Sequence, residues 1–160
     1  MTTDTNYYYQ IFTLIGNQKM VLDIFNRGRF SYMPHLVLNN DFSGQNWSVE
    51  ATQEKNQFQL STMVLGVRMW LDVIDGGIFD CLLIVVPKEK YSNREWKVVK
   101  NVRKKGFFTI STVLRKETKY IDLYQGGDFN NMPYLTTESA YSGQFWGVEK
   151  TNEEVFEYVL

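Results

Sequence analysis

Alternating apolar and polar residues predict short β-strands along most of the chain. From Tyr7 to Ile15 aromatic and β-branched residues dominate, and Tyr9, Ile11 and Thr13 fall on one face of the expected strand. The ranges Gln57 to Val64 and Phe107 to Leu114 repeat this pattern. We expect three equivalent first strands whose core side chains are Tyr9, Phe58, Phe108, Ile11, Leu60 and Ile110.

The stretch from Ile121 to Val148 matches Leu22 to Val49 and Leu71 to Val98 without a gap. Near the start of each copy stands an aspartate, and a tryptophan follows 24 residues later: Asp23 and Trp47, Asp72 and Trp96, Asp122 and Trp146. The copies are spaced 49 and then 50 residues apart. A fixed period with constant internal spacing is typical of a repeat architecture.

Three further strands are expected in each repeat after its first strand. The aspartate strand runs into a glycine-bearing turn, a third strand follows at His35 to Leu38, Leu83 to Val86 and Tyr134 to Thr136, and the tryptophan opens the fourth. Four strands in each of three units predict an all-β fold, the β-trefoil, with a six-stranded barrel and a cap of three hairpins. Closing the barrel removes edge strands, and a propeller would need more blades.

The three repeats, at residues 7–52, 56–101 and 106–152, occupy nearly all of the 160 residues, so we expect a single domain spanning 1–160. A C-terminal strand is expected at residues 153–160, where a fourth copy of the first strand would begin. We expect it to pair beside Tyr7 to Ile15. Strand exchange within a homodimer is the alternative.

The balance of charge sets limits on partners and location. With 17 Lys and Arg against 18 Asp and Glu the net charge is −1, so no general attraction to nucleic acid or to an anionic membrane is expected. Cys81 is the single cysteine and no apolar run reaches the ~18 residues of a membrane span. We expect a cytoplasmic protein without a membrane span, although a removed signal peptide would leave no trace.

Catalytic residue patterns are sparse. His35 and Cys81 are the single histidine and cysteine and stand in different repeats, and neither forms a metal-ligand cluster. Aspartates related by threefold symmetry should lie farther apart than the ~5–9.5 Å that paired glycosidase carboxylates require. We therefore predict a binding protein that is not an enzyme and uses no cofactor or metal.

A basic run lies between the second and third repeats. A solvated loop is the leading interpretation, and an acidic polymer, a sulfated glycan or a phosphate backbone is the alternative ligand. The run comprises Lys97, Lys100, Arg103, Lys104 and Lys105, with Lys88, Lys90 and Arg94 nearby.

A Gln-x-Trp tripeptide ends the first and third repeats, as Gln45-Asn46-Trp47 and Gln144-Phe145-Trp146, with Arg94-Glu95-Trp96 as a variant in the second. With the upstream Leu22-Asp23-Ile24 and its two counterparts, these motifs make residues 7 to 152 resemble the ricin B-type β-trefoil lectin family, particularly its disulfide-free fungal members. The resemblance implies binding of carbohydrate, usually galactose or N-acetylgalactosamine, in up to three shallow cap pockets. Glycans or glycoproteins would be the partners.

The resemblance also assigns the site residues. Asp23, Asp72 and Asp122 would accept hydrogen bonds from sugar hydroxyls, with Gln45 and Gln144 beside them. The family's stacking aromatic residue at the end of the third strand is missing, because Leu38, Pro87 and Thr137 stand there. Tyr32, Tyr134 or the set Phe30, Phe79 and Phe129 are the candidate substitutes. Repeats one and three share Met-Pro and Ser-Gly-Gln, so we expect sites there first.

The same residues have structural interpretations. Each aspartate could instead accept hydrogen bonds from the amides of the following glycine turn. The two glutamines are expected to satisfy backbone groups, and the three tryptophans to lie in the core.

A second hypothesis is a protein-binding trefoil, such as a protease inhibitor, that acts through its loops. The longest loops are Asn39 to Gly44, Pro87 to Arg94 and Thr137 to Gly143. The lectin is our leading hypothesis, because the aspartates and the Gln-x-Trp motif are present.

Overall fold

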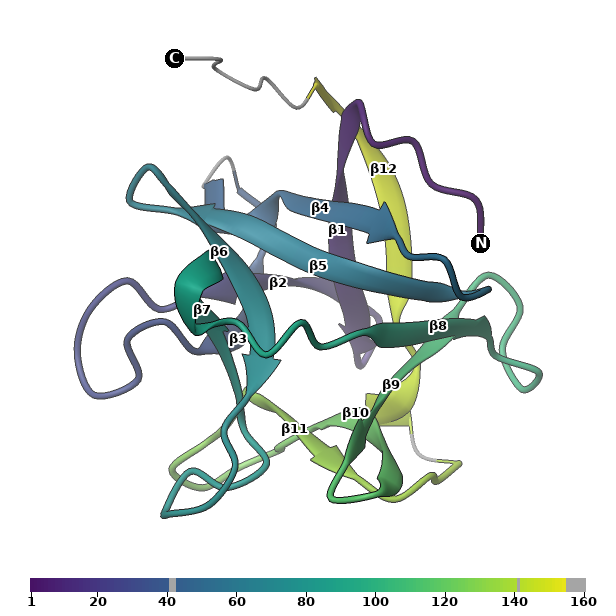
Figure 1. The fold of residues 1–160 in the computed structure, drawn as a ribbon. Helices are drawn as coiled ribbons and strands as arrows, with labels where there is room; N and C mark the ends of the chain where they lie inside the picture. Colours follow the sequence, from purple (N-terminus) through teal and green to yellow (C-terminus); the bar gives the residue numbers. More distant parts are fainter. Residues whose placement is uncertain (41–42, 141, 155–160) are drawn as a thin grey trace.

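The computed structural model describes residues 1–40, 43–140 and 142–154 (Figure 1). The chain forms twelve antiparallel strands in these ranges, four in each repeat. The first repeat holds β1 (Tyr7–Ile15), β2 (Gln18–Ile24), β3 (Pro34–Leu38) and β4 (Trp47–Ala51). The second holds β5 (Gln57–Val64), β6 (Val67–Val73), β7 (Leu83–Val86) and β8 (Trp96–Lys100). The third holds β9 (Phe108–Leu114), β10 (Glu117–Leu123), β11 (Pro133–Thr136) and β12 (Gly147–Glu154).

The first and fourth strands of the repeats form a closed barrel. β1 pairs with β4, β4 with β5, β5 with β8, β8 with β9, and β12 with β1. The last gap closes between Phe108 and Trp146, whose backbone groups exchange hydrogen bonds of 2.7 and 2.8 Å. A barrel built this way leaves no free strand edge among its six members. The predicted β-trefoil architecture is confirmed.

The second and third strands form the hairpins β2–β3, β6–β7 and β10–β11, whose turns gather at the lower left of Figure 1. Backbone hydrogen bonds of 2.8 Å link them in a ring: Leu36 donates to Asn131, Val85 to Tyr32, and Leu135 to Cys81. Each hairpin therefore donates one of these hydrogen bonds to one neighbouring hairpin and accepts one from the other.

The three tryptophans lie in the core, as predicted. Trp47 and Trp96 are fully buried and Trp146 is nearly so. Each indole N–H donates to the carbonyl 25 residues earlier, which belongs to Leu22, Leu71 or Ile121, at 3.0 to 3.2 Å. Each ring thus ties a fourth strand to the aspartate strand of its repeat. The predicted first-strand core side chains are buried as well, except that Phe108 is half-buried where β9 meets the residue before β12.

The cap has a small core of its own. Met33, Leu82 and Met132 are buried in it. Above them Phe30, Phe79 and Phe129 contact one another with ring centroids 5.8 Å apart in every pair. These three rings therefore pack around the pseudo-threefold axis.

The last described residues of the chain run beside β1. β12 continues through Lys150, opposite Tyr9, to Glu154, opposite Tyr7, so residues 153 and 154 extend the fourth strand of repeat three. The rest of the predicted C-terminal strand, residues 155–160, lies outside the described residues.

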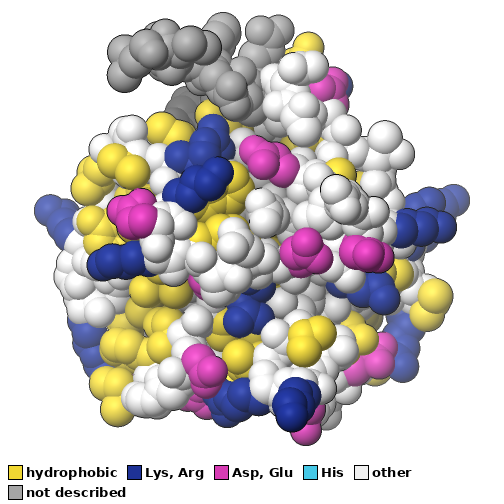
Figure 2. Space-filling view, viewed as in Figure 1, with side chains coloured by type: hydrophobic (Ala, Val, Ile, Leu, Met, Phe, Trp, Pro, Cys, Tyr) yellow, Lys and Arg dark blue, Asp and Glu magenta, His cyan; other side chains and the backbone are white. Residues whose placement is uncertain are grey.

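Figure 2 shows acidic and basic side chains interspersed over one face of the molecule, in keeping with the near-neutral net charge. In the described part of the chain, no helix has the length and apolar character needed to cross a membrane.

Candidate functional site

The three repeated aspartates occupy equivalent places in the cap hairpins. Asp23 lies on β2, Asp72 on β6 and Asp122 on β10, and the residues opposite them are His35, Ile84 and Tyr134. All three are buried, with 6 to 8% of their surface exposed. A buried carboxylate needs hydrogen-bond donors, so its partners define what each site can do.

In the first repeat Gln45 holds Asp23. One carboxylate oxygen of Asp23 accepts the backbone N–H of Ile24 at 2.7 Å, and the other accepts Nε2 of Gln45 at 3.0 Å. The fully buried Gln45 amide also donates to the Leu38 carbonyl at 3.3 Å and accepts the Asn40 N–H at 2.9 Å. Gln45 therefore connects the loop after β3 to the Asp23 carboxylate and sets the direction in which that carboxylate points.

The third repeat reproduces this arrangement. Asp122 accepts the Leu123 N–H at 2.7 Å and Nε2 of Gln144 at 3.1 Å. Gln144 donates in turn to the Thr137 carbonyl and accepts the Ser139 N–H, both at 2.8 Å. Both glutamines thus satisfy backbone groups, as predicted, and they also fix the carboxylates.

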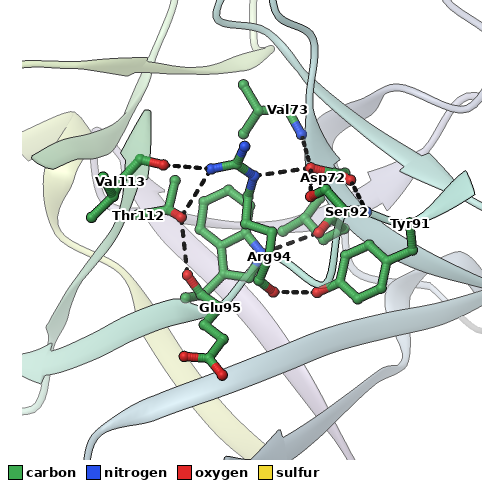
Figure 3. A network of polar contacts seen from close by, with 10 residues as sticks. Asp72, Val73, Tyr91, Ser92, Arg94, Glu95, Thr112 and Val113 are labelled. Carbon is green, nitrogen blue, oxygen red and sulfur yellow. Dashed lines mark hydrogen bonds and ion pairs between the residues drawn. The ribbon is translucent and has the colours of Figure 1, made fainter. Parts of the chain in front are cut away.

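The second repeat is built differently, because Arg94 stands in place of the glutamine (Figure 3). Nε of Arg94 forms an ion pair with Asp72 at 2.9 Å, and Ser92 donates to the same carboxylate through its N–H at 3.0 Å and its hydroxyl at 2.9 Å. With the Val73 N–H at 2.9 Å, the described residues supply four donors to Asp72. A carboxylate has about four acceptor positions, so Asp72 is saturated from within the protein.

Arg94 extends beyond Asp72 into the next repeat. Its Nη1 donates to the hydroxyl of Thr112 at 3.2 Å and to the carbonyl of Val113 at 2.7 Å, and its own carbonyl accepts the Tyr91 hydroxyl. The Arg94 side chain is 15% exposed, so it belongs to a buried network. The prediction that grouped Arg94 with the solvated basic run is wrong for this residue.

The contribution of Asp72 to the stability of the folded state should be lost at low pH. Burial alone raises the pKa of Asp72, but the hydrogen bonds from Ser92, Arg94 and Val73 together lower it below its usual value of 3.8. A lowered carboxyl pKa stabilises the folded state above pH 3.8, and this contribution is lost as the pH falls through the folded pKa. Urea unfolding of the wild type and of Asp72→Asn should therefore show a difference in stability that shrinks between pH 5 and pH 2. A difference independent of pH would contradict this assignment.

Glycine allows the loop backbone to approach the carboxylate in repeats one and three. A Cβ atom at Gly44 would lie 2.5 Å from Oδ1 of Asp23, and Gly143 has the same relation to Asp122. The Ser-Gly-Gln motif shared by these repeats therefore has a steric role: a larger residue would displace the carboxylate. Asn93 holds this position in repeat two, with a positive φ of 60°.

Stacked aromatic pairs lie beside the carboxylates of repeats one and three. Phe25 stacks on His35 with centroids 3.6 Å apart, and Tyr124 stacks on Tyr134 at 3.9 Å. Burial lowers the pKa of His35 while the Asp23 charge opposes this, and burial with the Asp122 charge raises the pKa of Tyr134. The charge of each carboxylate therefore affects the pKa of the ring beside it. In repeat two the equivalent residues are Ile74 and Ile84, which provide no ring.

A cavity of about 530 Å³ opens at the first-repeat carboxylate. Its lining includes Asp23, the Phe25–His35 pair and Arg27, together with the apolar residues Met63 to Leu65 at the end of β5 and the start of the β5–β6 turn. The site is therefore shared between repeat one and the first hairpin of repeat two. Its volume suits a small polar ligand with one apolar face.

The remaining sequence predictions have mixed outcomes. Tyr32 lies in the β2–β3 turn with a positive φ of 67°, and it is not among the residues lining the Asp23 cavity. Phe30, Phe79 and Phe129 pack on one another as described above. Each repeated aspartate accepts the N–H of the residue that follows it. In repeats two and three other side chains accept from the glycine turn, because Asp80 accepts the Gly76 N–H and Asn130 the Gly126 N–H, both at 2.6 Å.

His35 and Cys81 have different neighbours. His35 lies against Phe25, whereas the Cys81 thiol lies beside Asp80, and burial raises its pKa. Throughout residues 1–40, 43–140 and 142–154, no cluster of three or more His, Cys, Asp or Glu side chains is arranged as metal ligands.

The sequence interpretation overlooked three threonines that anchor the Gln-x-Trp segments. Thr13, Thr62 and Thr112 each donate to the carbonyl of the residue before the tryptophan, at 2.7, 2.7 and 2.9 Å. A threonine at the same place in all three first strands was the available signal. The sequence interpretation also overlooked the stacked pair of Phe25 and His35, and the pairing of Arg94 with Asp72.

Comparison with known proteins places this geometry in a fold class. No protein-family profile and no curated protein sequence matches the chain, but solved structures do. The ricin B-like lectin of Macrolepiota procera, solved with lactose, has a TM-score of 0.68 at 17% identity over 94% of this chain and 100% of the lectin. SeviL, solved with the asialo-GM1 saccharide, has a TM-score of 0.58 at 17% identity over 92% of this chain and 98% of SeviL.

A mosquitocidal holotoxin has a TM-score of 0.73 at 22% identity. The match covers 95% of this chain and 18% of the holotoxin, so this chain spans less than a fifth of that protein. The chain therefore has the β-trefoil fold of ricin B-like lectins, a fold that also occurs within a much longer protein.

Proposed function

We propose that this chain is a carbohydrate-binding protein with one sugar site at Asp23 and an equivalent site at Asp122. The observation that carries the proposal is the Asp23 carboxylate, held by the buried Gln45 at a cavity whose wall is the stacked Phe25–His35 pair. An oriented carboxylate and an adjacent aromatic wall are the two elements a sugar needs, because its ring has hydroxyls at its edge and C–H groups on its face.

Each residue has a distinct role in this proposal. Asp23 and Asp122 accept hydrogen bonds from vicinal hydroxyls, which charged acceptors bind more strongly than neutral ones. Gln45 and Gln144 are positioning residues, since they are almost completely buried and contact the carboxylates. Tyr134, stacked on Tyr124, takes the platform role in repeat three that His35 takes in repeat one.

The second repeat is excluded from binding in this proposal. Asp72 is saturated by Ser92, Val73 and Arg94, and the neighbouring Ile74 and Ile84 provide no aromatic face. A sugar could reach Asp72 only by displacing a buried ion pair, which would leave both charges uncompensated. We therefore propose two binding sites for the three repeats.

A galactose-type ligand is the finer part of the proposal. The resemblance of the Asp and Gln-x-Trp motifs to the lectin family supports it. So do two neighbours in fold, one solved with lactose and the other with the asialo-GM1 saccharide, because both of these saccharides contain galactose.

A glycan array tests the proposal directly. Labelled protein should bind glycans that share a terminal galactose or N-acetylgalactosamine, and the signal should persist at high salt because neutral sugars bind without net charge. Asp72→Asn at the saturated second repeat serves as a matched variant that should not change the pattern. A blank array at low and high salt would contradict the proposal and would favour a loop-based protease inhibitor.

A further inference from the structure

The barrel wall between repeats two and three carries a second concave surface, which we call the basic groove. Its cavity of about 430 Å³ is lined by Lys97, Lys100, Arg103, Ser111, Thr118 and Glu138, among others. Figure 1 places β8 and the loop after it on the right of the molecule, next to β9 and β10 and away from the cap turns. The basic groove is therefore separate from the Asp23 cavity.

The three cations of the basic groove are exposed and make no ion pair with any residue the structure describes. Lys97 and Lys100 project from β8, and Arg103 belongs to the β8–β9 loop. Among the described residues that line the groove, Glu138 is the one acidic side chain. The groove thus has an excess of positive charge on a protein whose net charge is −1.

Comparison of the three repeats shows that the barrel itself does not need these cations. At the positions one, three, four and seven residues after the tryptophan, repeat two has Lys97, Val99, Lys100 and Arg103. Repeat one has Ser48, Glu50, Ala51 and Glu54, and repeat three has Gly147, Glu149, Lys150 and Glu153. At these positions the sequence carries formal charges of −2 in repeat one, −1 in repeat three and +3 in repeat two. The other two repeats form the same wall without this positive charge, so the cations of repeat two are not required by the barrel and are free to contact an anionic ligand.

The hydroxyl groups differ between the walls as well. At the wall between repeats one and two, Nη1 of Arg68 donates to the hydroxyls of Ser48 and Ser61, at 3.0 and 2.8 Å. In the basic groove the counterparts are Thr118, Lys97 and Ser111, and Lys97 lies directly opposite Ser111 in the β8–β9 ladder. Thr118 is exposed, whereas Ser111 is buried with 4% of its surface exposed, so of these two hydroxyls that of Thr118 is the one a ligand can reach.

Cations beside hydroxyl groups in a shallow groove match the chemistry of an acidic sugar. Lysine and arginine pair with sulfate groups, and serine and threonine hydroxyls bond with sugar hydroxyls. The cations span seven residues of sequence, from Lys97 to Arg103, which suits a few charged groups on a short saccharide. We propose that the basic groove binds a sulfated oligosaccharide, independently of Asp23 and Asp122.

The test is a binding titration with a heparin hexasaccharide at 50 and 150 mM salt. The variant Lys97→Gln/Lys100→Gln/Arg103→Gln should lose at least tenfold in affinity, and its binding should depend less on salt because fewer ions are released. The matched control is Lys55→Gln/Lys90→Gln/Lys116→Gln, which removes the same charge from exposed lysines outside the groove. The control should change the affinity less than threefold, and both variants should melt at the wild-type temperature.

Three results would overturn the proposal. One is the absence of hexasaccharide binding by the wild type at 50 mM salt. Another is an equal loss of affinity in the groove and control variants, which would mean that net charge alone matters. The third is equally tight binding of single-stranded DNA of the same charge. Asp23→Asn/Asp122→Asn should keep hexasaccharide binding, so failure of the neutral-sugar sites would be seen separately from failure of the basic groove.

Discussion

Replacing Asp23 and Asp122 together by asparagine is expected to abolish binding of neutral galactosides. Each change removes the charge and substitutes an N–H₂ donor for one acceptor oxygen at the place where sugar hydroxyls would donate. Hydrogen bonds to charged groups contribute about 1.5–3 kcal/mol, so each site should weaken by more than tenfold. Retention on immobilised galactose and calorimetric titration with lactose measure the effect.

The repeat structure provides the control for this experiment. Asp72→Asn changes the equivalent carboxylate in the repeat that Arg94 closes, so it should leave galactoside binding per folded molecule unchanged. Asparagine keeps one acceptor for the Ile24 or Leu123 N–H, and the double variant should therefore remain folded. Undiminished lactose binding by the folded double variant would overturn both site assignments.

Arg94→Ala is expected to be the most destabilising single change outside the hydrophobic core. It leaves the buried Asp72 without its cation, and removal of one partner from a buried ion pair costs about 3–5 kcal/mol. The variant also removes the donors to Thr112 and Val113, and with them a link between repeats two and three. Urea unfolding at neutral pH measures the loss.

Arg94→Gln is the informative companion variant. Gln45 and Gln144 show that a glutamine at this position can donate to the aspartate at 3.0 and 3.1 Å, so this change should cost less than half as much as Arg94→Ala. Equal destabilisation by the two variants would show that the ion pair, rather than a donor of suitable reach, is what the second repeat requires.

The fold could be predicted because its main determinants are local and occur three times. Alternation placed Tyr9, Phe58 and their neighbours on the inner face, and the constant distance from aspartate to tryptophan set the register of each unit. A barrel formed from three such units has few alternative closures. Repetition therefore turned weak strand signals into a specific architecture.

The site was only partly predictable, because its chemistry depends on contacts between distant residues. From the sequence, Arg94 was interpreted as one more charge in a basic run. The sequence does not show that Asp72, 22 residues earlier, lies against it. The stacking of Phe25 on His35 arises from the β2–β3 register and from the path of the chain beyond β2. Leu38, Pro87 and Thr137 stand where ricin B-type lectins usually have a stacking aromatic residue. The rings that lie beside the carboxylates come from other positions in the hairpin.

The wall that repeat two contributes to the Asp23 cavity has an evolutionary consequence. Because Met63 to Leu65 line the same cavity as the carboxylate of the preceding unit, a pair of successive repeats is needed to form one binding site. A substitution in one first hairpin can change the ligand of the unit before it while its own aspartate stays intact. Duplicated repeats joined in this way can specialise separately, and an isolated copy would carry the carboxylate without the apolar lining from the next repeat.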